Sequence, residues 1–310
     1  MKSKLEPEIK CAPSKKYKDG SCFTLESLKI IAENYNKKNK KNKIDINQDK
    51  ANIVEQLEKK LSDKCSEQTC WLRLDIVKEL ENEEIDSNTF RPKGPSKKYD
   101  WLSTTNINDV IEQYQAMHDD FVFLGAVPVD FEDLPVLGIA NINLNEFKAD
   151  GKTKIGMVIN LDEHYKDGSH WVAFYTDLIK NQVYFFDSVG KPPVKRIRKF
   201  INRITKHLYM QKYNKNLPVN DIIKKLKTIN KEPSTKVHIS NEYIKNLLGG
   251  GFDIRYNNIQ HQFNNSECGV YSVNFIIRLL EGESFDSIIN NITKDDKMNA
   301  NRKIYFRNVI

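Results

Sequence analysis

Apolar positions in the first 95 residues recur with the period of an α-helix. In residues 24–35, 51–61 and 70–80 they return every three or four positions, which places them on one face of a helix. They are Leu25, Leu28, Ile31 and Tyr35, then Ile53, Val54, Leu57 and Leu61, then Trp71, Leu74, Val77 and Leu80. Thr24 precedes the first segment and is suited to cap a helix N-terminus. The pattern predicts three short amphipathic helices that form a small helical domain.

A segment of different composition follows these helices. Residues 91–100, RPKGPSKKYD, combine proline, glycine and lysine, which is typical of a linker. We therefore expect two domains, a helical accessory domain over residues 1–95 and a larger domain over residues 96–310.

The larger domain begins with a predicted helix at 101–114 and a strand-like segment at 120–131. Three runs rich in β-branched and aromatic residues follow, at 154–161, 170–177 and 181–188. Only a short connection separates the last two runs, so they are predicted to form a β-hairpin.

Further helices alternate with these strands. Residues 191–208 begin with prolines and place isoleucine and leucine on one face, which predicts an amphipathic helix. A basic stretch rich in lysine and asparagine fills 209–246, and 252–263 resembles another strand. Residues 268–282 are apolar on nearly every side and end at Gly282, so they predict a central buried helix. The mixed order predicts an α+β domain.

Length, hydropathy and charge narrow the class of protein. The chain has 310 residues, of which 39% are hydrophobic, enough to build a core. It lacks the apolar run of about 18 residues that a membrane helix requires, and its first residues lack the apolar segment of a secretory signal. We therefore expect a protein of a reducing cytoplasm, or of a particle assembled there, with no membrane partner.

The formal net charge of +7 carries less information. A compositional bias towards lysine and asparagine explains it, and weak contact with nucleic acid is the alternative. The densest basic run, NKKNKKNK at 36–43, is short and contains no aromatic residue, which favours a solvated loop.

Cys268 stands where the predicted buried helix begins. Peptide dipoles at a helix N-terminus favour a thiolate, and the unpaired N–H groups of the first turn can donate to an oxyanion. A buried structural cysteine is the alternative, and these residues alone favour it over a nucleophile.

The predicted hairpin supplies a base and a residue to orient it. His170 opens one strand and Asp187 ends the next, and these two ends of an antiparallel hairpin lie side by side. Asp177 is the competing acid, but it lies at the hairpin tip. A neighbouring carboxylate fixes the tautomer of an imidazole and stabilises the imidazolium. Gln262 lies six residues before Cys268, and its amide is placed to donate to an oxyanion.

The order His170, Asp187, Gln262 and Cys268 resembles the ubiquitin-like-protein-specific cysteine protease family, which includes SUMO proteases and adenovirus-type proteases. The matching segments are GSHWVAFYTDLIKNQVYFFDSVG and QFNNSECGVYSVNF, and WLSTTNI at 101–107 is similar to the first motif of the family. The sequence departs from the pattern at Glu267, at Ser103 and in its long 187–262 segment, which affects specificity more than chemistry.

The resemblance implies a papain-like, adenain-type cysteine protease fold with a central mixed sheet and a buried helix that starts at the nucleophile. It implies an endopeptidase that cuts after Gly-Gly-like motifs and uses no cofactor, with activation by DNA or a peptide as a secondary expectation. Trp101 is expected to line the substrate channel, with core packing as the alternative. For Trp171, packing near the imidazole and packing in the core are left open.

The lysine- and asparagine-rich style resembles family members of large DNA viruses, where related enzymes mature virion polyproteins. We therefore expect action in a viral factory in the host cytoplasm and packaging in the virion. A deconjugating isopeptidase for a ubiquitin-like modifier and a catalytically silent binding protein are the alternatives.

Two further features lie outside this constellation. The other four cysteines are spaced unlike the ligands of a structural zinc site, so free thiols are favoured over a metal site or a disulfide: Cys11, Cys22, Cys65 and Cys70. The glycine-rich LLGGGF at 247–252 is predicted to be a flexible turn, which is favoured over a self-cleavage site.

Overall fold

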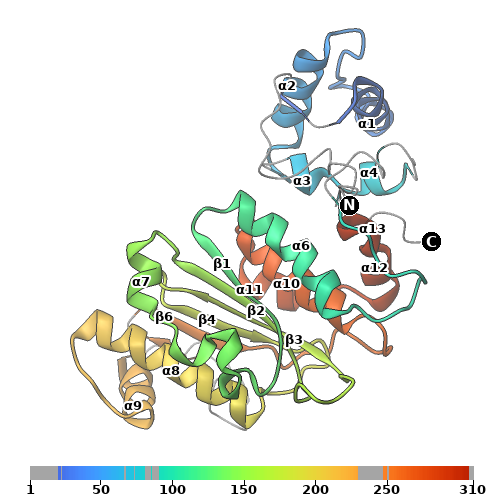
Figure 1. The fold of residues 1–310 in the computed structure, drawn as a ribbon. Coiled ribbons are helices and arrows are strands. Elements are labelled where there is room, and N and C mark those ends of the chain that lie inside the picture. The colour runs from blue at the N-terminus through green and yellow to red at the C-terminus, as the bar shows by residue number, and fades with distance from the viewer. Residues whose placement is uncertain are drawn as a thin grey trace, which may run out of the picture. The chain divides into compact units, whose positions relative to one another are not determined.

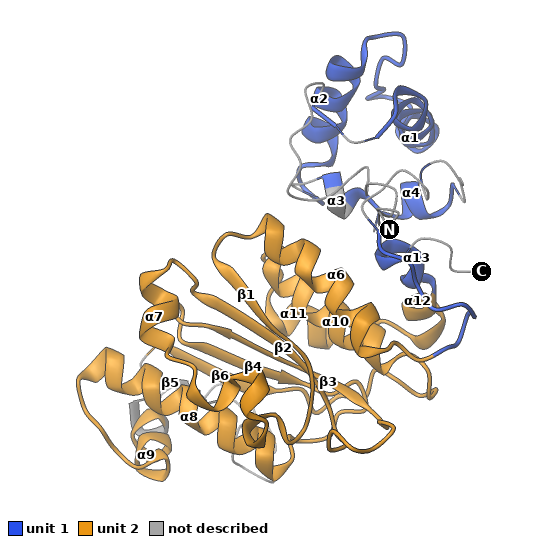
Figure 2. Ribbon diagram, viewed as in Figure 1, with its two compact units in different colours: residues 1–100, 300–310 blue, residues 101–299 orange. Residues whose placement is uncertain are grey.

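The computed structural model describes residues 20–21, 23–65, 68–72, 74–80, 85, 91–229, 247–249 and 251–306. Within these ranges, the side chains at 69–70, 227–229 and 247–249 are not described. The chain divides into two compact units, one of residues 1–100 with 300–310 and one of residues 101–299 (Figure 2).

The first unit is helical, as its sequence pattern predicts. Its helices are α1 Leu25–Lys38, α2 Lys50–Leu61, α3 Gln68–Trp71, α4 Asp75–Lys78 and α13 Arg302–Tyr305 (Figure 1). The side chain of Thr24 accepts a hydrogen bond from the N–H of Ser27 and caps α1, while Asp49 caps α2 in the same way. The predicted apolar faces of α1 and α2 are buried, so hydrophobic burial holds these helices in place.

The single helix predicted over 70–80 is wrong. The chain forms two short helices, α3 and α4, because Leu74 adopts an extended conformation with ψ 138°. The break allows Trp71 to stack on Phe23, with ring centroids 6.0 Å apart, while Val77 is also buried. Tertiary packing thus overrides helical periodicity at this point.

Cys65 is disulfide-bonded to a cysteine whose side chain the structure does not describe. The expectation of a free thiol is therefore wrong at this position.

The segment 91–100, predicted to be a linker, begins with a buried residue. Arg91 is fully buried and donates hydrogen bonds to the carbonyl oxygens of Ile85 and Lys303. Arg302 in α13 donates to the carbonyl oxygen of Asp100 at 2.7 Å. These bonds tie residues 300–310 to the first unit, whereas the sequence placed the domain boundary at 95/96 and assigned the C-terminus to the larger domain.

The second unit is built on one mixed sheet of six strands in the order β1-β2-β3-β4-β6-β5. The strands are β1 Phe121–Pro128, β2 Lys154–Asn160, β3 Trp171–Asp177, β4 Gln182–Phe186, β5 Leu247–Gly249 and β6 Phe252–Tyr256. β1 runs parallel to β2 and β4 runs parallel to β6, while the other neighbouring strands are antiparallel. The predicted hairpin is present as β3 and β4, with Ala173 opposite Phe186.

Helices cover both faces of this sheet (Figure 1). Those of the second unit are α6 Thr104–Met117, α7 Leu144–Ala149, α8 Lys195–Tyr213, α9 Val219–Ile229, α10 Cys268–Leu280, α11 Phe285–Asn290 and α12 Asp295–Ala300. Three short 3-10 helices, η1 Phe131–Asp133, η2 Pro135–Leu137 and η3 Ile139–Asn141, follow β1. The apolar side of α8 packs on the β2, β3 and β4 side chains of one face, and α10 packs on β2 and β3 with α6 beside it.

This architecture confirms the predicted α+β class, with a central mixed sheet and a buried helix that starts at Cys268. All but one of the α10 residues are buried, which explains the continuous apolar run in the sequence. The described helices are all too short or too polar to cross a lipid bilayer.

Two segments contain structure that the sequence pattern did not predict. The stretch 209–246 contains α9. Its buried residues Ile222 and Leu226 are separated by lysines in the sequence, so the apolar face of this helix was not recognised. LLGGGF is not only a turn, because Leu247–Gly249 forms β5 and pairs with β6. Backbone pairing with β6 thus places residues 247–249 in the sheet.

Candidate active site

His170 and Asp187 meet at the open end of the β3–β4 hairpin. Nε2 of His170 donates a hydrogen bond to Oδ1 of Asp187 at 2.7 Å. The register explains this contact, because Ala173 opposite Phe186 brings the residues just before β3 and just after β4 together. Asp177 lies at the other end of β3, where it accepts the N–H groups of Ile179 and Lys180.

A second layer of hydrogen bonds fixes Asp187. Asn257, which follows β6, accepts the N–H of Asp187 at 2.8 Å and donates to its carbonyl oxygen at 2.6 Å. Oδ1 of Asp187 also accepts the N–H of Val189 at 3.0 Å. The turn continues through Gly190, at φ 75°, where a Cβ would approach the backbone of Ile259 to 3.0 Å. Asn257 thus fixes the peptide group of Asp187, and the N–H of Val189 orients its carboxylate.

Cys268 is the first residue of α10 and is buried. Glu267 precedes it without a side-chain cap on the helix, so the first-turn N–H groups remain directed at the end where the sulfur lies. Gly269 follows, and a Cβ there would come within 3.0 Å of Cβ of Leu102. The glycine is therefore required for close packing of α10 against the segment before α6.

His170 connects the carboxylate to the thiol. Burial lowers the pKa of His170, but its hydrogen bonds and charge interactions with Asp187 and Cys268 outweigh burial and raise the pKa to about 9. Because Nε2 is bound to Asp187, Nδ1 is the nitrogen left for Cys268. The imidazole is therefore protonated at neutral pH, so it can donate through Nε2 to Asp187 and through Nδ1 to Cys268.

Gln262 is a buried residue of the loop that joins β6 to α10. Its Oε1 accepts a hydrogen bond from Oγ of Ser188 at 2.6 Å, which fixes the orientation of the amide. Its Nε2 donates to the carbonyl oxygen of Asn264 at 2.6 Å. An amide nitrogen carries two hydrogens, so one N–H remains for a further acceptor.

The two tryptophans line one hollow of about 440 Å³, with Leu102 and residues of the 160–168 connection. Trp101 is 48% exposed, so it is not a core residue. Trp171 is only 7% exposed, and its Nε1 donates to the carbonyl oxygen of Leu102 at 3.0 Å. Trp171 is therefore both packed in β3 and part of the hollow next to His170.

Sequence reasoning missed the residues that orient this site. Asn257, Ser188 and Asp295 all bind loop backbone or a site side chain, and they lie 31 to 74 positions from those partners. Ser188 directly follows Asp187 in the segment that matches the protease family, and this position was the only sequence signal for its role. Nothing in the sequence points to Asn257 or Asp295.

Within the described residues, no group of three or more His, Cys, Asp or Glu side chains is arranged to hold a metal ion. Of the cysteines considered for zinc, the side chains of Cys11, Cys22 and Cys70 lie outside the described residues.

Sequence comparison relates the chain to viral proteases. Residues 145–309 match the family described as "Ulp1 protease family, C-terminal catalytic domain". An Acanthamoeba polyphaga mimivirus protein named as a putative thiol protease is 32% identical over 317 residues, covering 96% of this chain and 93% of its own. A cysteine protease of African swine fever virus (isolate Tick/Malawi/Lil 20-1/1983) is 23% identical over 248 residues, 76% of each chain.

Comparison with solved structures identifies a protein of similar fold. A crystal structure of an African swine fever virus protease aligns with a TM-score of 0.54 and covers 97% of this chain and 96% of that one. At 18% sequence identity, this likeness shows that the two proteins share a fold.

Proposed function

The chain belongs to the Ulp1 protease family and is a cysteine peptidase, and we propose that it is an endopeptidase that cuts after Gly-Gly-like motifs. One observation carries the proposal for the site. His170 is hydrogen bonded to Asp187 and interacts with Cys268 at the start of α10, so a base, its orienting acid and a thiol form one connected group.

We propose the following roles for these residues. The Cys268 thiolate attacks the carbonyl carbon of the substrate, and the carbonyl π electrons move to the oxygen. Gln262 Nε2 and the Cys268 N–H donate to the resulting oxyanion. As the C–N bond breaks, protonated His170 gives its proton to the leaving amine. His170 then takes a proton from water as the water oxygen attacks the thioester carbonyl carbon. When the C–S bond breaks, the carboxylic acid product leaves and the Cys268 thiolate is restored beside the protonated His170.

We propose no metal or organic cofactor for this reaction. The thiol, imidazole, carboxylate and amide side chains supply the nucleophile, the base, its orientation and the oxyanion donor. Peptidase activity is therefore expected to be unchanged by EDTA and lost on alkylation of Cys268.

The hollow between Trp101 and Trp171 supports the proposed preference for small residues. An extended Gly-Gly segment is the thinnest form of a peptide, so it suits a hollow that two tryptophans line next to His170. We therefore place the residues on the acyl side of the scissile bond in this hollow. The alternative function, a deconjugating isopeptidase, is supported by an African swine fever virus relative that is named as a SUMO-1 cysteine protease.

We propose viral structural or core polyproteins as substrates, with action in the host cytoplasm and packaging in the virion. The support is that the compared relatives come from mimivirus and African swine fever virus. A catalytically silent scaffold is not favoured, because such a protein needs no connected cysteine, histidine and aspartate.

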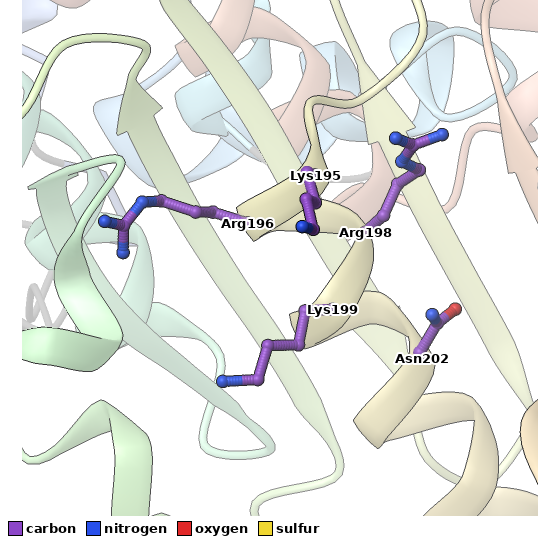
Figure 3. Close-up of a pocket in the computed structure, with 5 residues that line it drawn as sticks. All are labelled: Lys195, Arg196, Arg198, Lys199 and Asn202. Carbon is purple, nitrogen blue, oxygen red and sulfur yellow. The ribbon is translucent and has the colours of Figure 1, made fainter.

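We also propose that nucleic acid contacts the protein through α8. Four cations of its first turns line a hollow of about 670 Å³, together with Asn202: Lys195, Arg196, Arg198 and Lys199 (Figure 3). Arg196 is paired with Asp133, whereas no described acidic residue forms an ion pair with Lys195 or Arg198. Affinity for duplex DNA that falls steeply with salt, and falls further in Lys195→Ala/Arg198→Ala, is expected. Added DNA in the peptidase assay tests the secondary expectation of activation.

A substrate panel tests the proposed function. Matched peptides that contain Gly-Gly, Gly-X-Gly or Ala-Ala, a ubiquitin-like precursor and an isopeptide-linked conjugate are incubated with the protein and with Cys268→Ala. We expect cleavage of linear peptides after small-residue motifs, located by mass spectrometry and absent in the variant. Cleavage confined to the conjugate supports the isopeptidase, and a folded protein that cleaves nothing contradicts both.

A further inference from the structure

Phe263 is an aromatic residue in an unexpected environment. Its side chain is 72% exposed, whereas the two preceding residues, His261 and Gln262, are each only 2% exposed. Single exposed apolar residues are common on protein surfaces, so exposure alone does not identify a site. Two further observations are that the backbone of the loop around Phe263 is fixed by hydrogen bonds and that this loop adjoins the active site.

The backbone beneath the ring is held from two sides. The N–H groups of Phe263 and Asn264 both donate to Oδ2 of Asp295 at 2.9 Å, and Oδ1 of Asp295 accepts the hydroxyl of Tyr271 at 3.1 Å. On the other side, the N–H groups of His261 and Gln262 both donate to the carbonyl oxygen of Ser188 at 2.8 Å. An exposed ring on a fixed backbone loses little conformational entropy when it binds a ligand.

The hydrogen bonds to Ser188 also place the Phe263 ring beside the active site. Ser188 directly follows Asp187, the hydrogen-bond partner of His170, and Gln262 directly precedes Phe263. Phe263 is nevertheless absent from the described lining of the hollow that contains Trp101 and Trp171. The active site therefore has an exposed aromatic side chain on its rim, outside that hollow.

We propose that Phe263 is a specificity-determining residue that contacts the substrate on the leaving-group side of the scissile bond. The proposal rests on the proposed function, in which the acyl side of the substrate lies in the hollow. A polypeptide is continuous, so the part that follows the scissile bond leaves the hollow and crosses the rim.

The chemistry of the ring defines what it recognises. A phenyl ring with its face and edges in solvent gains from contact with apolar or aromatic side chains, and it gains little from serine or glycine. The substrate class is therefore a protein with a small-residue motif followed, within two positions, by leucine, methionine or an aromatic residue.

Two quenched fluorescent peptides test this inference. They share the acyl-side sequence ending in Gly-Gly and differ only in the next two residues, Leu-Leu in one and Ser-Ser in the other. Wild type, Phe263→Ala, Phe263→Leu and Ile179→Ala are compared by kcat and KM. Ile179 is a matched control, because it is 58% exposed but follows β3 at the end opposite His170.

We expect the wild type to favour the Leu-Leu peptide through a lower KM. Phe263→Ala is expected to raise KM for that peptide roughly tenfold and to leave the Ser-Ser peptide unchanged. Phe263→Leu is expected to retain most of the preference, and Ile179→Ala all of it.

An equal loss on both peptides overturns the inference, because it means that the substitution disturbs Gln262 rather than a substrate contact. Equal KM values for the two peptides in the wild type also overturn it. Failure of the wild type to cleave either peptide contradicts the proposed function itself, a distinct outcome from the other two.

Discussion

Nε2 of His170 lies 2.7 Å from Oδ1 of Asp187, although 17 positions separate the two residues in the chain. The hairpin between them brings its open ends together, and Asn257, directly after β6, holds the Asp187 peptide. Nδ1 of the same ring is left for Cys268. This relationship determines how the activity should respond to pH and to substitution.

The pH dependence follows from the raised pKa of His170. Burial lowers this pKa, but the interactions with Asp187 and Cys268 raise it to about 9. In the proposed mechanism the imidazolium of His170 protonates the leaving group, and this form is present below about pH 9 and lost above it. We therefore expect kcat/KM to fall on the alkaline side with a midpoint near pH 9.

Asp187→Asn tests the cause of that midpoint. The substitution removes a charge that raises the pKa of His170, so the alkaline limb should move to lower pH and activity should fall. The pH profile of kcat/KM for the variant measures both. An unchanged alkaline limb would show that another group controls it.

Ser188→Ala is expected to lower kcat roughly tenfold with little change in KM. It removes the hydroxyl that fixes the Gln262 amide, and loss of a complete oxyanion donor costs about 10²–10³ in kcat. Ser272→Ala is the control, because the buried hydroxyl of Ser272, also near the start of α10, has no hydrogen-bond partner among the described residues. Equal effects of the two substitutions would contradict the positioning role of Ser188.

Gly269→Ala is expected to destabilise the protein by about 1–3 kcal/mol, as overpacking does in a filled core. Alanine normally stabilises a helix interior relative to glycine by about 0.5–1 kcal/mol, so the sign of the change is informative. The cause is the approach to Leu102, whose Cβ would lie 3.0 Å and whose Cγ and Cδ1 would each lie 3.2 Å from the added methyl group. Urea unfolding measures the change, and Leu102→Ala in the same chain should recover part of it.

The two tryptophans should respond differently to alanine. Trp101→Ala is expected to raise KM for Gly-Gly peptides without lowering thermal stability, because the side chain is half exposed and lines the hollow. Trp171→Ala is expected to cost about 3–5 kcal/mol of stability, because the indole is buried and bound to Leu102. Similar losses of stability in both variants would contradict this assignment.

Features set by short-range patterns were predictable from the sequence. The hairpin has a short connection, so register alone places His170 beside Asp187. The start of α10 at Cys268 follows from the continuous apolar run and the glycine that ends it. The cap of α1 follows from Thr24, whose side chain accepts the N–H of Ser27 in the first turn.

Features set by packing between distant segments were not predictable. The break between α3 and α4 depends on Trp71 reaching Phe23, 48 positions earlier. The need for Gly269 arises from Leu102, and the support for Asp187 comes from Asn257, 70 positions away. Periodicity contains no information about such partners, because each depends on how the elements are assembled.

Covalent labelling tests the central claim most directly. The protein is incubated with a Gly-Gly peptide that carries a thiol-reactive C-terminal group, and the labelled residue is located by mass spectrometry. We predict one adduct on Cys268, absent in Cys268→Ala and strongly reduced in His170→Ala. Labelling of other cysteines alone, or equal labelling of the wild type and His170→Ala, would contradict the assignment of Cys268 as a nucleophile activated by His170.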